Sequence, residues 1–262
     1  MRLFDTHCHL GDEKLREHSA ELLEQAVSAG VEALTVICAD PENIREFDSF
    51  IPKLRALNKN ITVYRSAGLH PHEAQHASPE LYQLIESQLQ SDAIGVGETG
   101  LDFFYDFSKP DVQIPVFEKH IDWSVQYNKP LIIHCREAAK DTLRLLNRPD
   151  VISKQNPGIL HCFTETLDTA KQLVDWNFMI SFSGILTFNN ATDLREVAKW
   201  VPDTHLLIET DSPYLAPKPH RGRTNQPAYV AHTFELICQL RGQSPEELSE
   251  ILWHNSQKVF GL

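Results

Sequence analysis

Short apolar runs alternate along this chain with longer segments in which apolar residues recur every three or four positions. In one such segment, positions 22, 23, 26 and 27 lie on one helical face, and Gly30 provides a stop. The short runs are apolar on both faces, which is typical of buried parallel strands. The pattern predicts strands at 2–5, 31–37, 61–68, 93–96, 130–134, 158–163, 178–183 and 205–210. It predicts helices at 19–30, 43–58, 78–90, 114–128, 138–147, 167–176, 193–201, 228–242 and from 244 onward.

Proline and capping residues mark several of these helices. Pro79 stands at the first position of one helix, where a missing N–H does no harm. Ser244 and Glu247 form a capping box at the start of the last helix. Pro52 lies inside the periodic segment 43–58, so we expect it to break or bend that helix.

Regular alternation of strand and helix predicts an α/β protein with a parallel sheet. Eight strand–helix units in 262 residues favour a closed (β/α)8 barrel of the TIM type, in a single domain spanning 1–262, over an open doubly wound sheet. The first strand is not followed by the glycine pattern of a dinucleotide-binding fold. In such a barrel, functional side chains project from the carboxyl ends of the strands.

The charge balance is acidic. Asp and Glu number 36 against 24 Lys and Arg, a formal net charge of −12, which argues against indiscriminate binding to nucleic acid or anionic membranes. No apolar run is long enough for a transmembrane helix, and no signal peptide is expected. The five cysteines show no paired spacing, so we expect buried thiols in a reducing, cytoplasmic setting.

Metal-ligand residue types stand at the ends of five of the predicted strands. Each one alone has a structural alternative, as a hydrogen-bonded side chain or a turn residue. Together they are hard to explain structurally, because the barrel gathers all strand ends at one mouth. The candidates are His7 and His9, Glu98, His134, His161 and Asp211.

Six ligands exceed the three or four that one zinc-like ion takes, which indicates two divalent ions. Glu98 is the natural bridge because its two carboxylate oxygens can each bind one ion. Asp211 is positioned to bind one ion and to accept the proton of a water whose pKa the ions lower. Mixed nitrogen and oxygen ligands allow zinc, manganese or magnesium.

Seven stretches of the chain carry an ordered set of motifs, at 4–9, 67–72, 95–102, 133–136, 160–164, 207–215 and 221–227. These motifs resemble those of the TatD-related metal-dependent hydrolases of the amidohydrolase superfamily. The resemblance covers nearly the whole chain and implies a (β/α)8 barrel, the six ligands above, and a cytoplasmic deoxyribonuclease that often acts 3′→5′ on single strands.

Other residues near the strand ends have candidate roles. His70 is expected to contact a phosphate oxygen or leaving group, partly on the strength of the resemblance, and His72 to be structural. Glu209 precedes Asp211 by two residues and shares its face, so it is expected to orient a ligand histidine. The loop after the fourth strand carries Phe103, Phe104, Tyr105 and Phe107, for which base stacking and simple packing are both open.

The candidate substrate-binding residues are Arg136, Arg221 and Asn225. A guanidinium suits a phosphodiester, and phosphates commonly bind near the last strands of barrels. Asn225 has the alternative of shaping its loop, and Arg223 that of a solvated surface residue.

The sequence therefore predicts a two-metal phosphodiesterase that acts on DNA at single-stranded ends. We expect no association with a membrane and no obligate protein partner. One alternative is a superfamily hydrolase of a small ester, lactone or amide. Another is a non-catalytic metal-binding or partner-binding barrel.

Overall fold

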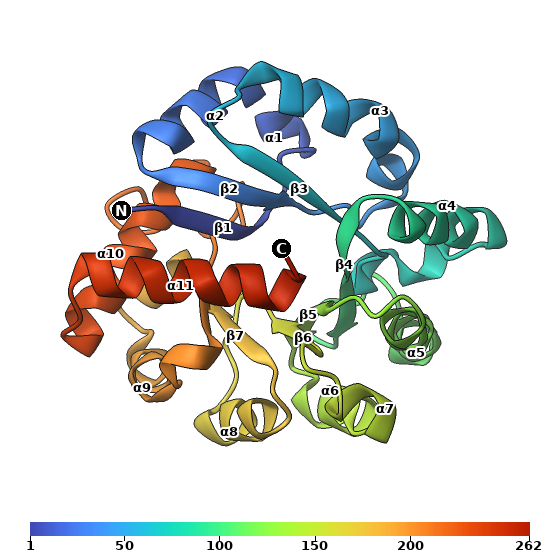
Figure 1. The fold of residues 1–262 in the computed structure, drawn as a ribbon. Helices are drawn as coiled ribbons and strands as arrows, with labels where there is room; N and C mark the ends of the chain where they lie inside the picture. The colour runs from blue at the N-terminus through green and yellow to red at the C-terminus, as the bar shows by residue number, and fades with distance from the viewer.

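The computed structural model describes residues 1–262 and shows eight parallel strands arranged as a nearly closed barrel with helices outside it (Figure 1). Neighbouring strands pair in sequence order from β1 to β8. The predicted (β/α)8 fold is therefore confirmed. The strands are β1 (Leu3–Cys8), β2 (Val31–Val36), β3 (Thr62–Ala67), β4 (Ala93–Asp102), β5 (Leu131–Arg136), β6 (Gly158–Leu160), β7 (Met179–Phe182) and β8 (Leu206–Ile208).

Eleven α-helices surround or close the barrel, and all nine predicted helices are among them. The helices are α1 (Glu13–Arg16), α2 (Ser19–Ser28), α3 (Pro41–Leu57), α4 (Pro79–Gln90), α5 (Pro110–Gln126), α6 (Ala139–Leu146), α7 (Pro149–Ile152), α8 (Leu167–Asp175), α9 (Thr192–Trp200), α10 (Val230–Arg241) and α11 (Pro245–Phe260). Short 3₁₀ helices are η1 (Pro71–His76), η2 (Gly184–Thr187), η3 (Asp203–His205) and η4 (Pro227–Tyr229).

The expected break at Pro52 is wrong, because α3 continues through it. Apolar residues on both sides of the proline, including Phe47, Ile51 and Leu54, are buried. Their packing holds the helix together across the position where a backbone hydrogen bond is lost. The Ser244 half of the expected capping box is present, since its hydroxyl accepts a hydrogen bond from the Glu247 N–H.

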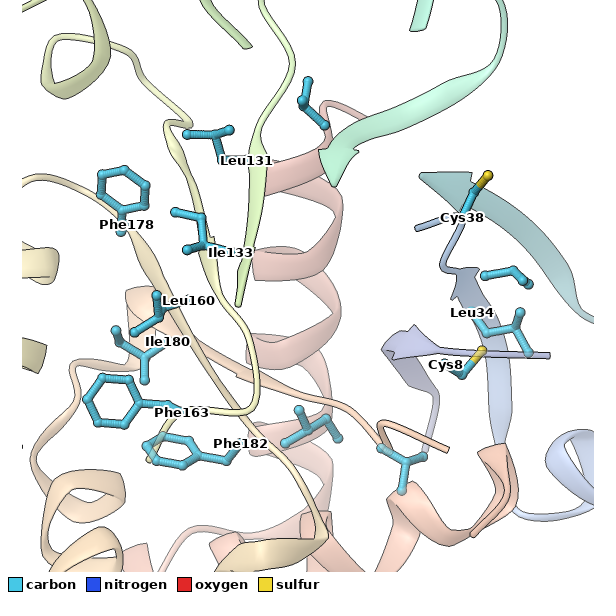
Figure 2. Packing of buried hydrophobic residues seen from close by; sticks show 14 of the residues in the cluster. Cys8, Leu34, Cys38, Leu131, Ile133, Leu160, Phe163, Phe178, Ile180 and Phe182 are labelled. Carbon is cyan, nitrogen blue, oxygen red and sulfur yellow. The ribbon is translucent and has the colours of Figure 1, made fainter. Parts of the chain in front are cut away.

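The main apolar core lies between the strands and the surrounding helices. Figure 2 shows Leu131, Ile133, Leu160 and Ile180 from β5, β6 and β7 in this layer. Cys8 and Cys38 are fully buried in the same core, as expected for buried thiols. Cys135 and Cys162 are only partly buried.

A smaller apolar cluster closes the amino-terminal end of the barrel. Helix α11, red in Figure 1, lies across this end. Phe4 packs there against Trp253 and Phe260, with ring centroids 6.0 and 5.9 Å apart. The opposite mouth, at the carboxyl ends of the strands, is left for polar side chains. None of the helices combines the length and the hydrophobicity that a membrane-spanning helix needs.

Strands β1 and β8 meet through individual hydrogen bonds instead of a regular ladder. The Asp5 carboxylate accepts hydrogen bonds from the Thr210 N–H, at 2.8 Å, and from its hydroxyl, at 2.6 Å. Just beyond β8, the Asp211 N–H donates to the carbonyl of His7 on β1 at 2.9 Å. The first and last strands are thus joined where metal-ligand candidates stand.

Candidate metal centre

Glu98 lies at the centre of the polar mouth, on β4, with only 2% of its surface exposed. Two glycines, Gly97 and Gly100, let this strand approach β5 closely. Their φ angles are 145° and 137°, which L side chains rarely adopt, and a Cβ at Gly97 would collide with the Ile132 carbonyl oxygen. This close approach brings the Glu98 carboxylate within reach of side chains on β1 and β5 and of one directly after β6.

One oxygen of Glu98 faces a group formed by His7, His9 and Asp211. The Nε2 atoms of His7 and His9 are 3.1 Å apart, as expected for alternate residues on one face. Glu98 Oε2 is 3.3 Å from His7 Nε2 and 3.6 Å from His9 Nε2. Asp211 Oδ1 is 3.7 and 3.4 Å from the same two nitrogens. Two nitrogens and two carboxylate oxygens therefore converge.

The other oxygen of Glu98 faces His134 and His161. Glu98 Oε1 is 3.1 Å from His134 Nδ1 and 2.7 Å from His161 Nε2. His70 Nε2 also lies 3.3 Å from this oxygen. All six predicted ligands thus come together, in two groups that share only Glu98.

The outward nitrogens of the second group face further carboxylates. His134 Nε2 is 3.0 Å from Asp102 Oδ2, and His161 Nδ1 is 3.3 Å from Glu209 Oε1. A carboxylate behind a histidine fixes the ring's orientation and proton position, as in many metal sites. The contact expected of Glu209 is present, and the histidine that it faces is His161.

Asp102 was not singled out from the sequence. The expected strand ended at 96, whereas β4 continues to Asp102, paired with Arg136 on β5. The missed signal is the even spacing of Glu98 and Asp102, which places them on one face of a continuous strand.

The electrostatics favour positive charge at the centre. Burial alone would raise the pKa of Glu98, but His161, His70 and His7 outweigh it and hold this pKa well below its ordinary value. Burial opposes protonation of His161, yet Glu98 and Glu209 raise its pKa well above the usual range. The pKa of Asp211 is lowered despite burial, chiefly by its hydrogen bond with His9. The carboxylates are therefore ionised and attract cations.

The donor set fits a metal ion. Glu98 Oε2 is buried without a hydrogen-bond partner, although such atoms are usually satisfied. The groups His7, His9 and Asp211, and Glu98, His134 and His161, each bring ligand atoms within 4.8 Å of one another. A divalent cation would satisfy the unpaired oxygen and neutralise the carboxylates.

His70 and His72 differ in what they offer. The Nδ1 atom of His70 accepts a hydrogen bond from the His72 N–H at 3.1 Å, so in the neutral ring the proton is on Nε2, facing Glu98. Burial lowers the pKa of His70 to about 4, so the ring is neutral near pH 7. His72 Nε2 lies 2.8 Å from Asp102, as suits the structural role expected for it.

The expected substrate-binding residues lie in different settings. Arg136 is half-buried, with its guanidinium carbon 4.0 Å from the Phe104 ring centroid. Arg221 is exposed, 3.6 Å from the Phe188 ring centroid. Asn225 is fully buried, and its amide donates to the Thr210 and Tyr214 carbonyls at 2.8 and 2.6 Å. This geometry favours loop shaping, the alternative for Asn225.

Sequence comparison relates this chain to a known family. The family model described as TatD related DNase matches residues 4–261. The chain is 38% identical over 264 residues to the uncharacterized metal-dependent hydrolase YcfH of Escherichia coli K12, covering 99% of this chain and 96% of that protein. It is 31% identical to a protein of Salmonella typhimurium named 3′-5′ ssDNA/RNA exonuclease TatD, covering 98% of each.

Solved structures agree with this assignment. The crystal structure of YjjV, a TatD homologue of Escherichia coli K12, superposes with a TM-score of 0.88 at 26% identity, covering 100% of this chain and 98% of that one. An engineered organophosphate-hydrolysing lactonase shares the fold alone, with a TM-score of 0.65 at 12% identity. With a matching donor set at the expected strand ends, the chain belongs to the TatD family of metal-dependent hydrolases.

Proposed function

We propose that this protein is a two-metal deoxyribonuclease that trims single-stranded DNA ends, with 3′→5′ polarity. The observation that supports this proposal most is that the two carboxylate oxygens of Glu98 face different ligand groups. Oε2 faces His7, His9 and Asp211, and Oε1 faces His134 and His161. A carboxylate shared between two ligand groups suits paired ions, a common arrangement for phosphodiester hydrolysis. The relative named as a 3′-5′ ssDNA/RNA exonuclease supports the substrate.

Each side chain has a distinct task in this proposal. Zinc, manganese or magnesium ions, when bound, would activate water and neutralise phosphate charge. Asp211, ionised at neutral pH, accepts the proton of the attacking water. His70 keeps its Nε2–H 3.3 Å from Glu98 Oε1 and is the candidate donor to a phosphate oxygen or leaving group held at that point. Glu98 holds both ligand groups in register.

Cationic side chains at the mouth position the strand. Arg136 and Arg221 have no ion-pair partner within the chain, so their donors are free for phosphate oxygens. Two such cations suit contact with a short stretch of single strand. The five free cysteines fit a reducing compartment, which supports a cytoplasmic location.

A substrate panel tests the function. The metal-loaded protein is assayed with a single-stranded oligonucleotide, a circular single strand, an RNA strand, and small esters and lactones, each with and without chelator. We expect shortening of the linear DNA from its 3′ end, abolished by chelator, and little cleavage of the circle. Rapid cleavage of the circle would contradict end trimming. Turnover of a lactone or ester without any cleavage of oligonucleotides would establish the small-molecule alternative.

A further inference from the structure

Three exposed aromatic side chains stand together in the loop after β4. Phe104, Tyr105 and Phe107 are 50%, 40% and 58% exposed. Apolar surface of this kind, gathered in one place and rimmed by polar groups, marks a binding site more often than chance exposure does. The rings touch one another, with centroids 4.8 Å apart for Phe104 and Tyr105 and 5.5 Å apart for Tyr105 and Phe107.

This cluster begins at the candidate metal centre and extends outward. The His72 ring lies 5.9 Å from the ligand candidate His134. On its other side, His72 lies 4.8 Å from Phe107 and 5.4 Å from Tyr105. A group stacked on Phe107 would therefore lie beyond His72, further from the metal centre than a group held at His134.

A free guanidinium completes the cluster. The Arg136 guanidinium carbon is 4.0 Å from the Phe104 centroid and 4.7 Å from the Tyr105 centroid. Contacts with two ring faces orient the cation but use none of its N–H donors for ion pairs. Arg136 follows His134 by two residues on β5, so it lies at the same strand end.

The loop is already fixed in shape. Asp102 Oδ1 accepts hydrogen bonds from the Phe104 and Tyr105 N–H groups at 3.0 and 2.9 Å. The buried Gln113 amide donates to the Ser108 carbonyl at 2.7 Å, at the far end of the loop. A ligand that binds here would not have to order the loop first, which favours affinity.

We propose that Phe107 and Arg136 form a nucleotide subsite, in which Phe107 stacks an unpaired base and Arg136 binds an adjacent phosphate of a single-stranded nucleic acid. Phe104 and Tyr105 hold the guanidinium in place. Flat ring faces beside a guanidinium match a base joined to a phosphate, whereas a small ester offers neither. The subsite rests on the proposed function and explains a preference for single strands, since a paired base has no free face. Stacking on a ring tolerates any base.

The test removes one base from the oligonucleotide and the Phe107 ring from the protein, separately and together. Oligothymidylates of about ten nucleotides carry a single abasic residue at successive positions from the cleaved end. Binding is followed by fluorescence anisotropy and cleavage by product length, for the wild type, Phe107→Ala and Phe107→Trp. Trp200→Ala is the control. Trp200 is a 37% exposed aromatic residue at the carboxyl end of α9, at the opposite end of the barrel from the carboxyl ends of the strands.

In the wild type and in Trp200→Ala, one abasic position should weaken binding and raise KM by about 5- to 100-fold, with little change in kcat. In Phe107→Ala the same abasic residue should cause no further loss of binding and no further rise in KM. Phe107→Trp should again bind the abasic strand more weakly than the intact one. If base removal weakens the wild type and Phe107→Ala equally, the subsite is wrong while the nuclease proposal stands. If the wild type neither binds nor cleaves any oligothymidylate, the nuclease proposal fails and the subsite fails with it.

Discussion

Glu209 lies directly behind His161, with its Oε1 atom 3.3 Å from Nδ1, while Nε2 of the same ring points at Glu98 from 2.7 Å. The carboxylate is fully buried and also accepts hydrogen bonds from the Cys162 N–H and the Ser181 hydroxyl. One imidazole thus lies between two carboxylates, with its Nε2 atom facing the centre of the mouth.

Replacing Glu209 with Gln should weaken metal binding while keeping the fold. The amide oxygen can replace Oε1 and still accept from the Cys162 N–H, and the NH2 group can replace Oε2 and donate to the Ser181 hydroxyl oxygen, but the charge that faces the His161 ring is lost. We expect metal affinity to fall roughly 10- to 100-fold, measured by competition with a chromophoric chelator. Glu196→Gln, on the exposed face of α9, is the control. Unchanged affinity in the Glu209 variant would show that the carboxylate is merely structural.

Replacing Glu98 with Gln tests the shared ligand. An amide nitrogen cannot bind a cation, so one of the two ligand groups loses its common oxygen. Metal content, measured by elemental analysis, should fall from about two ions per chain to one or fewer, and turnover should fall with it. A variant that keeps two ions and wild-type activity would contradict the bridging role.

Replacing Asp211 with Asn preserves the shape but removes the proton acceptor. The rate should fall by about 10²-fold or more, assayed on a linear oligonucleotide at saturating metal. Metal content is measured alongside, because Asp211 also faces His7 and His9. A near-normal rate would transfer the acid–base role to another group, with His70 the first to examine.

Acid should destabilise the fold through His120. This buried residue of α5 accepts a hydrogen bond from the Leu69 N–H at 3.0 Å, while its Nδ1 lies 2.7 Å from the Val116 carbonyl oxygen. Burial lowers its pKa to about 4. The unfolded chain, with a pKa near 6.5, binds the proton first, so the stabilisation present above this pH is lost as the pH falls toward 4.

Between pH 7 and pH 5 this contribution to the free energy of unfolding should decrease by about 2 kcal/mol. Urea unfolding of the wild type and of His120→Gln, each at pH 7 and pH 5, isolates the contribution of His120, since the two proteins share all other titrating groups. Equal pH dependence in the two proteins would exclude His120 as the source.

Replacing Arg221 with Ala should raise KM for an oligonucleotide. We expect binding by the wild type to show a log–log salt slope on the order of −1.5 to −3, from about two to four phosphate contacts. Losing Arg221 should flatten this slope by about one contact. Arg223→Ala, in the same exposed loop, provides the comparison. A slope unchanged by the Arg221 substitution would place this residue outside the path of the strand.

The positions of the candidate ligands were predictable because parallel strands of a barrel end at one mouth. Alternation put His7 and His9 on one face, and the remaining ligands each followed an apolar run. The length of β4 was not predictable, because the glycines around Glu98 lower strand propensity, and only pairing with β5 shows that the strand continues to Asp102. The continuity of α3 through Pro52 likewise depends on tertiary packing, which local rules do not include.

The junction of β1 and β8 makes the centre depend on the whole chain. Asp5 and Thr210, which join these strands, are 205 residues apart in sequence. A chain still on the ribosome, with only its first seven strands made, lacks both Asp211 and Glu209. Its His7 and His9 have no partner from the last strand. Assembly of the full candidate metal centre therefore has to wait until the last strand has been synthesised and has met the first.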